Sequence, residues 1–260
     1  MHRVLAACFW SLWMVLLPAA AGAQVELKVL VGGAVSEAVA EVGEAYARSS
    51  GSRFAYFRDT TGALQKRLAS GEAADVIVLA APGMDALQKD NRIVADTRVD
   101  LARALIGVAV RVGAPAPDLS TVETFKAALL EARSVSYVSP AAGGTSGTYI
   151  DGLLRRLGIA DAMKSKIVYR TQGSEVADAV ASGEAELGIT FTSELQPNKG
   201  VRVTGTLPAE IQLPTIYVGA VVATSRNADA ARAFLRRLAS AEGRAAIKKA
   251  GLEPVGRQAR

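Results

Sequence analysis

Short apolar segments alternate with segments of helical periodicity along most of this chain, and this alternation constrains the fold more than any other feature. In the first series, strand-like segments at 27–31, 53–57 and 75–79 are followed by helical patterns at 36–48, 62–69 and 84–89. Short, fully apolar strands that alternate with helices are typical of parallel sheets covered by helices on both faces. In such sheets ligands bind at the carboxyl ends of the strands.

A second series of the same kind follows a break in regular structure at Gly113–Pro117. Its strand-like segments lie at 105–110, 135–138, 166–169 and 187–191, its helical patterns at 148–157 and 174–182, and Ser120–Glu123 offers a capping box for a further helix. A long apolar segment at 216–222 and helices at 228–240 and 242–250 close the chain. We expect an α/β protein with two lobes, in which 24–108 plus 216–260 form lobe 1 and 109–215 form lobe 2.

A glycine-rich turn, Ser139–Tyr149, connects the strand at 135–138 to a helix and is suited to hold an anion. Backbone N–H groups at a helix start are unpaired, and the helix dipole adds about half a positive charge there. Thr145 and Ser146 add hydroxyl groups. The turn Arg58–Gly62, with Thr60 and Thr61, repeats this arrangement after the strand at 53–57. The two turns are expected to converge on one small anionic ligand; the alternative is that each is an ordinary capped helix start.

Residues 1–23 have the features of a cleavable export signal. A basic start, Met1–Arg3, precedes an apolar segment, Val4–Pro18, which is short for a membrane span, and Ala21–Ala23 offers a cleavage site. This leader contains the only cysteine and the only histidine of the chain. The mature protein therefore lacks disulfides, cysteine or histidine zinc sites and histidine-activated nucleophiles. We expect neither a metal nor a cofactor.

The charges of the chain are evenly spread. Thirty Lys and Arg residues against 25 Asp and Glu residues give a formal net charge of +5. The absence of basic runs argues against a nucleic-acid partner, and a modest positive charge suits the capture of a small anion. No heptad pattern or aromatic patch predicts self-association, so a monomer is expected.

Five short motifs in the same order resemble periplasmic solute-binding proteins of the molybdate-binding type. They are Val29–Ala38, Thr60–Leu64, Gly71–Val78, Ser146–Tyr149 and Gly183–Phe191. The resemblance covers essentially the whole mature chain. It implies the type II periplasmic binding fold with a ligand cleft between the lobes, a periplasmic location, and delivery of the ligand to an ABC permease.

The resemblance also implies a set of ligand-binding positions: Ala34, Val35, Thr60, Thr61, Thr145, Ser146, Gly147, Tyr149, Val176 and Phe191. Two of them depart from the family. Ala34 stands where the family has a serine, and Phe191 stands where it has a tyrosine. A buried donor or acceptor without a partner costs about 1–3 kcal/mol, so the loss of two hydroxyl groups weakens the case for a tetrahedral oxyanion.

A larger anion is the alternative. Arg58 and Arg170 flank the turns, and a guanidinium group binds a carboxylate through two parallel hydrogen bonds. The segment Asp96–Asp118 resembles a branch of the superfamily that includes periplasmic aconitate isomerase. Such an enzyme shifts a double bond and needs a base beside the carbon chain, for which Asp59, Tyr149 and Glu175 are candidates.

The sequence favours a periplasmic receptor that captures an oxyanion or a polycarboxylate for an ABC importer. The alternative is an isomerase that interconverts cis- and trans-aconitate in the same cleft.

Overall fold

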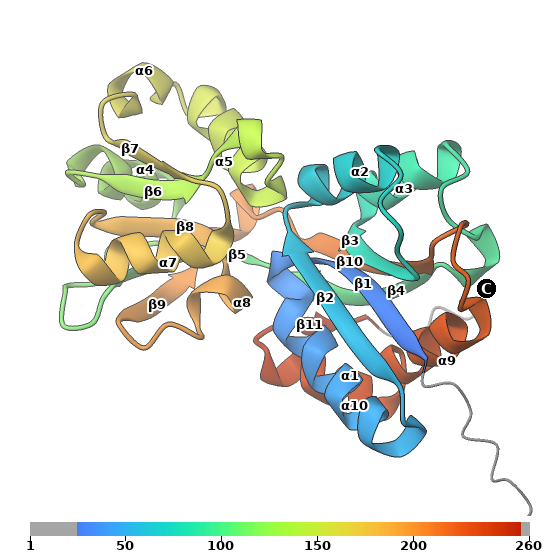
Figure 1. Cartoon of the computed structure of the whole chain (residues 1–260). Coiled ribbons are helices and arrows are strands. Elements are labelled where there is room, and N and C mark those ends of the chain that lie inside the picture. Colours follow the sequence, from blue (N-terminus) through green and yellow to red (C-terminus); the bar gives the residue numbers. More distant parts are fainter. Residues whose placement is uncertain (1–24, 256–260) are drawn as a thin grey trace, which may run out of the picture.

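The computed structural model describes residues 25–255 and has two lobes, each built around one mixed β-sheet (Figure 1). The predicted leader, 1–23, lies outside the described residues. The first sheet has six strands in the spatial order β11 (Glu253–Pro254), β4 (Val99–Ala104), β10 (Thr215–Val221), β3 (Val76–Ala80), β1 (Glu26–Gly32) and β2 (Arg53–Asp59). β1 runs parallel to β2 and β3, whereas β10 is antiparallel to β3 and β4.

Helices cover both faces of this sheet because each sheet face and each helix has an apolar side. One face packs against α2 (Thr61–Ala69) and α3 (Ala81–Lys89), and the other against α1 (Ser36–Ser50), α9 (Ala228–Leu238) and α10 (Ala241–Lys249). In α9, Ala231, Phe234, Leu235 and Leu238 recur at helical spacing and are all buried. Short 3-10 helices, η1 (Gly33–Val35) and η2 (Ala95–Thr97), complete the lobe.

The second sheet has five strands in the order β7 (Ile167–Arg170), β6 (Val135–Val138), β8 (Leu187–Phe191), β5 (Ile106–Arg111) and β9 (Val201–Thr206). One face packs against α4 (Val122–Glu131), α5 (Thr145–Arg156) and α6 (Ala160–Met163), the other against α7 (Gly173–Ser182). The short helix α8 (Thr192–Leu195) directly follows β8, and the 3-10 helices η3 (Pro140–Ala142) and η4 (Ala209–Ile211) lie near the first lobe.

The two-lobed α/β prediction is confirmed, with differences in detail. The sheets are mixed rather than parallel, because β5 and β10 enter each sheet from the other lobe and run against their neighbours. β4 and β9 were not predicted. The capping box of α4 is formed by Thr121 and Thr124 and not by Ser120 and Glu123, so the helix starts one residue later than expected.

The chain passes between the lobes at two places, through Leu105 and through the segment 207–214. The side chain of Gln212 joins the two passages: its amide oxygen accepts from the N–H of Ile106 at 3.1 Å, and its amide nitrogen donates to the carbonyl of Ile106 at 2.8 Å. Within residues 25–255, the helices are all too short or too polar to cross a membrane.

Candidate functional site

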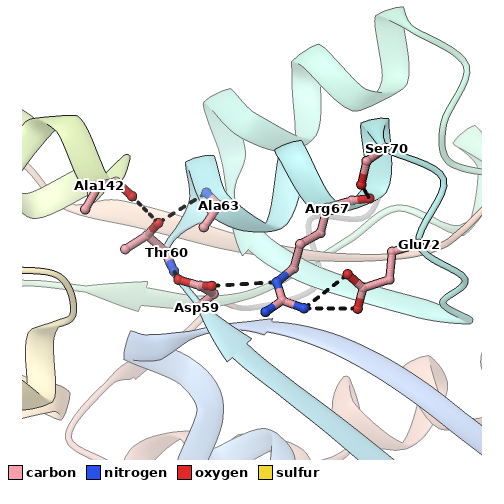
Figure 2. Close-up of polar contacts among 7 residues, drawn as sticks. All are labelled: Asp59, Thr60, Ala63, Arg67, Ser70, Glu72 and Ala142. Atoms are coloured by element: carbon pink, nitrogen blue, oxygen red, sulfur yellow. Dashed lines mark hydrogen bonds and ion pairs between the residues drawn. The ribbon is translucent and has the colours of Figure 1, made fainter.

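The start of α2 forms one wall of the site, at the carboxyl end of β2 (Figure 2). Thr60 is the N-cap: its hydroxyl oxygen accepts from the N–H of Ala63 at 3.2 Å and donates to the carbonyl of Ala142 in the other lobe at 2.5 Å. Asp59 accepts from the N–H of Thr60 at 2.8 Å and lies 3.7 Å from Arg67. The first helix start is thus both capped and in contact with the second lobe.

The start of α5 forms the facing wall. Gly143, which ends η3, has a φ of +74°, a conformation that favours glycine. Its carbonyl accepts from the N–H of Gly62 at 3.1 Å, and the hydroxyl of Thr145 donates to the hydroxyl of Thr61 at 3.4 Å. The two glycine-containing turns therefore meet across the cleft, one from each lobe.

Between these helix starts lies a cavity of about 20 Å³, room for about one water molecule. Of the predicted site residues, six line it: Asp59, Thr60, Thr61, Thr145, Ser146 and Phe191. Seven lining residues were not predicted: Gly33, Val138, Gly144, Gln172, Gly173, Glu194 and Tyr217. The lobes are closed on one another, so a ligand larger than a water molecule can enter only when they move apart.

Glu194, in α8, contributes a carboxyl group to this cavity from the second lobe. Its side chain is buried, and its Oε2 accepts a hydrogen bond of 2.6 Å from the hydroxyl of Thr190. Among the described residues, Lys and Arg side chains are all beyond ion-pair distance of it. Burial raises the pKa of Glu194, although the hydrogen bond from Thr190 and the positive charge of Arg58 act in the opposite direction.

Two glycines make room for the Glu194 carboxyl group. A Cβ atom added to Gly33 would lie 2.5 Å from Oε1 of Glu194, and one added to Gly173 would lie 2.0 Å from its Oε2. Gly173 is the first residue of α7, so the carboxyl group lies against the start of that helix. Backbone on both sides of the cleft thus encloses this acid.

Arg58, on β2, lies close to the same place. The added Cβ on Gly33 would be 3.7 Å from its Nε, and that Nε is buried without a hydrogen-bond partner among the described residues. Its Nη1 lies 3.6 Å from Glu37, which is largely exposed. Arg58 does not line the small cavity, but its guanidinium group lies next to the cavity, and its Nε–H is free to donate a hydrogen bond.

Aromatic rings form the remaining wall. Tyr217, on β10, packs edge to face against Phe191 with ring centroids 5.9 Å apart. Burial, together with the nearby charge of Glu194, raises the pKa of Tyr217 well above its ordinary value, so its phenol group stays neutral. Phe191 has no hydroxyl group to offer, as the sequence indicates.

The other predicted residues lie outside this lining, in positions that the local structure explains. Glu175 caps α7: it accepts from the N–H of Thr171 at 2.9 Å and of Gln172 at 3.2 Å. Burial acts in the opposite direction, but these hydrogen bonds lower the pKa of Glu175. The hydroxyl of Tyr149 donates to the carbonyl of Ile211 at 2.6 Å, at the crossing between the lobes.

Arg170 is ion-paired with Glu184 and donates to the carbonyl of Tyr169 at 2.8 Å. The four remaining predicted residues are small or aliphatic and lie outside the lining of the cavity: Ala34, Val35, Gly147 and Val176. Metal-like clusters of three or more His, Cys, Asp or Glu side chains do not occur within residues 25–255.

Glu194 is the carboxyl group of the cavity lining that sequence reasoning missed. A signal for it exists, because Phe191 ends a strand that was predicted, and Glu194 is the first acidic residue after that carboxyl end. Thr192, Ser193 and Glu194 read as a polar loop, yet all three are buried. They are buried because α8 packs against η1 of the first lobe. A contact between segments so distant in the chain leaves no local sequence pattern that would predict this burial.

The chain resembles known proteins over nearly its full length. It is 36% identical over 240 residues to aconitate isomerase from a Pseudomonas species, covering 89% of each chain. It is 26% identical over 196 residues to a putative ABC transporter substrate-binding lipoprotein, YvgL, from Bacillus subtilis, covering 74% of this chain and 72% of that one. The periplasmic molybdate-binding protein of Azotobacter vinelandii superposes with a TM-score of 0.71 at 18% identity, covering 89% of this chain and 100% of that one.

A model of the bacterial extracellular solute-binding proteins matches residues 27–253. This match spans both lobes and includes every residue of the cavity. The chain therefore belongs to the bacterial extracellular solute-binding protein family.

Proposed function

We propose that this protein binds aconitate between its lobes and shifts the double bond, interconverting the cis and trans isomers. The observation that carries this proposal is the buried carboxyl group of Glu194 in the cleft. Capture of a tetrahedral oxyanion makes no use of such a carboxyl group. A double-bond shift, by contrast, requires a group that takes up and gives back a proton.

The donors around the cleft suit a polycarboxylate. Thr61 and Thr145 bring hydroxyl groups to two helix starts from opposite lobes, where negative charge is stabilised. Arg58 adds a cation with an unpaired Nε beside the cavity. We assign Arg58 to one carboxylate of the substrate and the helix starts to the others. The 36% identity to an aconitate isomerase supports the same substrate.

A receptor that passes its ligand to an ABC permease is the second candidate. The similarity to the putative ABC transporter substrate-binding lipoprotein of Bacillus subtilis favours it, and it requires closure of the lobes but no proton transfer. Both functions use the same cleft, so they differ only in what happens to the bound ligand.

The deciding experiment incubates the purified protein separately with cis- and trans-aconitate and follows the vinyl protons by NMR. Thermal melts with cis-aconitate, trans-aconitate, citrate, molybdate, tungstate and sulfate run in parallel. We expect interconversion of the aconitate isomers, and about 2.7 kcal/mol of stabilisation by aconitate at a hundred times its dissociation constant. Stabilisation by aconitate without interconversion would support the receptor, and stabilisation by molybdate or tungstate alone would contradict a polycarboxylate ligand.

The role of Arg58 is tested in the same assays. Replacing it with Ala is expected to remove the stabilisation by aconitate, because a carboxylate loses its cationic partner. Arg170→Ala is the matched control, since Arg170 is already paired with Glu184 outside the cavity. Equal losses in the two variants would show that Arg58 has no specific contact with the ligand.

A further inference from the structure

We propose, on the basis of the isomerase function above, that Glu194 is the catalytic base of the double-bond shift and that Thr190 is the positioning residue that holds it. Two carboxyl groups line the cavity, those of Asp59 and Glu194. Asp59 already accepts from the N–H of Thr60 and lies 3.7 Å from Arg67. Glu194 has no ion pair among the described residues, although the positive charge of Arg58 acts on it, and its Oε1 lies toward Gly33, between the lobes.

A chain of hydroxyl groups fixes the orientation of Glu194. The hydroxyl of Thr190 donates its single proton to Oε2 of Glu194 at 2.6 Å. Its oxygen lies 3.2 Å from the hydroxyl of Ser146, which must then be the donor in that second bond when Glu194 is ionised. All three side chains are buried. Ser146 belongs to the first turn of α5, so the chain connects the carboxyl group to a helix start that faces the ligand.

The chemical step balances with this one carboxyl group. The ionised Glu194 removes a proton from the methylene carbon of aconitate, and the electron pair of that C–H bond forms the new double bond to the central carbon. The electron pair of the old double bond moves to the former vinyl carbon and is delocalised onto its carboxylate. Glu194, now a neutral acid, returns a proton to that carbon and is ionised again.

Closure of the lobes strengthens the base. A carboxylate removed from water binds a proton more tightly, and burial raises the pKa of Glu194 in the closed form. The charged or titratable groups that face it are Arg58 on β2, which favours the ionised form, and the phenol of Tyr217 on β10. The start of α7 at Gly173 and the hydroxyl of Thr190 also favour the anion. Substrate binding and base activation therefore occur together.

The test compares Glu194→Gln with Glu175→Gln, which changes a carboxyl group that caps α7 outside the cavity lining. We expect E194Q to keep the thermal stabilisation by aconitate and to lose about 10²- to 10⁴-fold in turnover, the usual contribution of a general base. E175Q is expected to turn over as the wild type does. An E194Q protein within a few-fold of wild-type turnover would overturn the assignment of Glu194 alone. Failure of the wild type to interconvert aconitate would instead overturn the proposed function, and the assignment with it.

The role of Thr190 has its own readout, the pH dependence of turnover. Thr190→Val keeps the shape of the side chain but removes the hydrogen bond to the carboxylate. The anion then loses stabilisation and its pKa rises further, so the acid limb of the pH profile is expected to move to higher pH with little change in KM. Thr190→Ser restores the hydroxyl group and should restore the limb. An unmoved acid limb in T190V contradicts the positioning role.

Discussion

At the scale of single residues, the burial of Glu194 makes the stability of the protein depend on pH. The folded protein favours its neutral form, so its pKa lies above the ordinary value of 4.5. Above about pH 4.5 the unfolded chain has released this proton and the folded chain retains it, so the folded state binds more protons. The free energy of unfolding therefore falls as the pH rises, by at most about 1.4 kcal/mol per pH unit for one group, until the folded pKa is reached.

Glu194→Gln is accordingly expected to raise the melting temperature of the ligand-free protein at pH 7. The gap from the wild type should shrink as the pH is lowered through 4.5, and it should vanish below that pH, where both states of the wild type are protonated. Glu175→Gln serves as the opposite case: the folded pKa of Glu175 is lowered, so its stabilising contribution is present at pH 7 and is lost in acid. Melting curves of the three proteins at several pH values measure this, and an E194Q gap that does not change with pH would contradict the buried-acid interpretation.

These residues also show what a sequence can and cannot reveal about a site. The hydroxyl groups of Thr60, Thr61 and Ser146 stand where strands pass into helices, and local patterns place them at a ligand cleft. Glu175 stood in an equally plausible pattern, but its capping bonds to Thr171 and Gln172 occupy its carboxyl group. Only contacts between segments distant in the chain distinguish it from Glu194.

At the scale of elements, α2 contacts the turn before α5 across the cleft, and we expect closure of the lobes to depend on this contact. Gly62 and Gly143 approach so closely that a Cβ atom added to Gly62 would lie 2.9 Å from the Cα of Gly143. Gly62 has no positive φ and lies in the first turn of a helix, where Ala is the better helix former by up to about 1 kcal/mol. The space between the lobes, not the backbone conformation, requires glycine here.

Gly62→Ala is therefore expected to weaken aconitate binding about tenfold or more, equal to about 1.4 kcal/mol, without lowering the melting temperature of the ligand-free protein by a similar amount. Titration calorimetry measures the affinity, and thermal melts of the ligand-free protein measure its stability. Gly152→Ala, in α5, is the matched control, because the nearest atom to its added Cβ is the Arg156 guanidinium of the same helix at 3.6 Å. Unchanged affinity in G62A would show that closure does not need this contact.

Some helices and strands can be predicted from local sequence patterns, and others cannot. β3, with five consecutive buried apolar residues, is readable from sequence, and so is α9 with its regular apolar face. β4 was missed because Asp100 and Arg103 interrupt its apolar pattern and its pairing with β10 is distant in the chain. Helix α5 starts at Thr145, three residues before the predicted start. Its N-cap, Gly144, has no side chain to form a capping hydrogen bond, so the sequence does not mark this start.

At the scale of the whole molecule, the two lobes share one apolar core although they have separate sheets. Leu27 and Phe234 of the first lobe belong to the same cluster of buried side chains as Phe125 and Ile189 of the second. Phe191 and Tyr217 meet at the boundary, and Gln212 bonds both backbone groups of Ile106 where the chain crosses. Opening of the cleft can separate the helix starts while this crossing side stays packed.

We therefore expect the ligand-free protein to unfold in a single cooperative transition, rather than one lobe at a time. Calorimetry should give one peak, with an enthalpy near 0.7 kcal/mol per residue at about 60 °C and a van't Hoff enthalpy equal to the calorimetric one. Gln212→Leu leaves the N–H of the buried Ile106 without its partner, at about 1–3 kcal/mol, whereas the Ile106 carbonyl still accepts from the N–H of Leu207 at 3.1 Å. The substitution should lower the melting temperature by several degrees while keeping one peak. Two resolved peaks in the wild type would mean that the shared core does not couple the lobes, because each sheet would then lose its structure independently of the other.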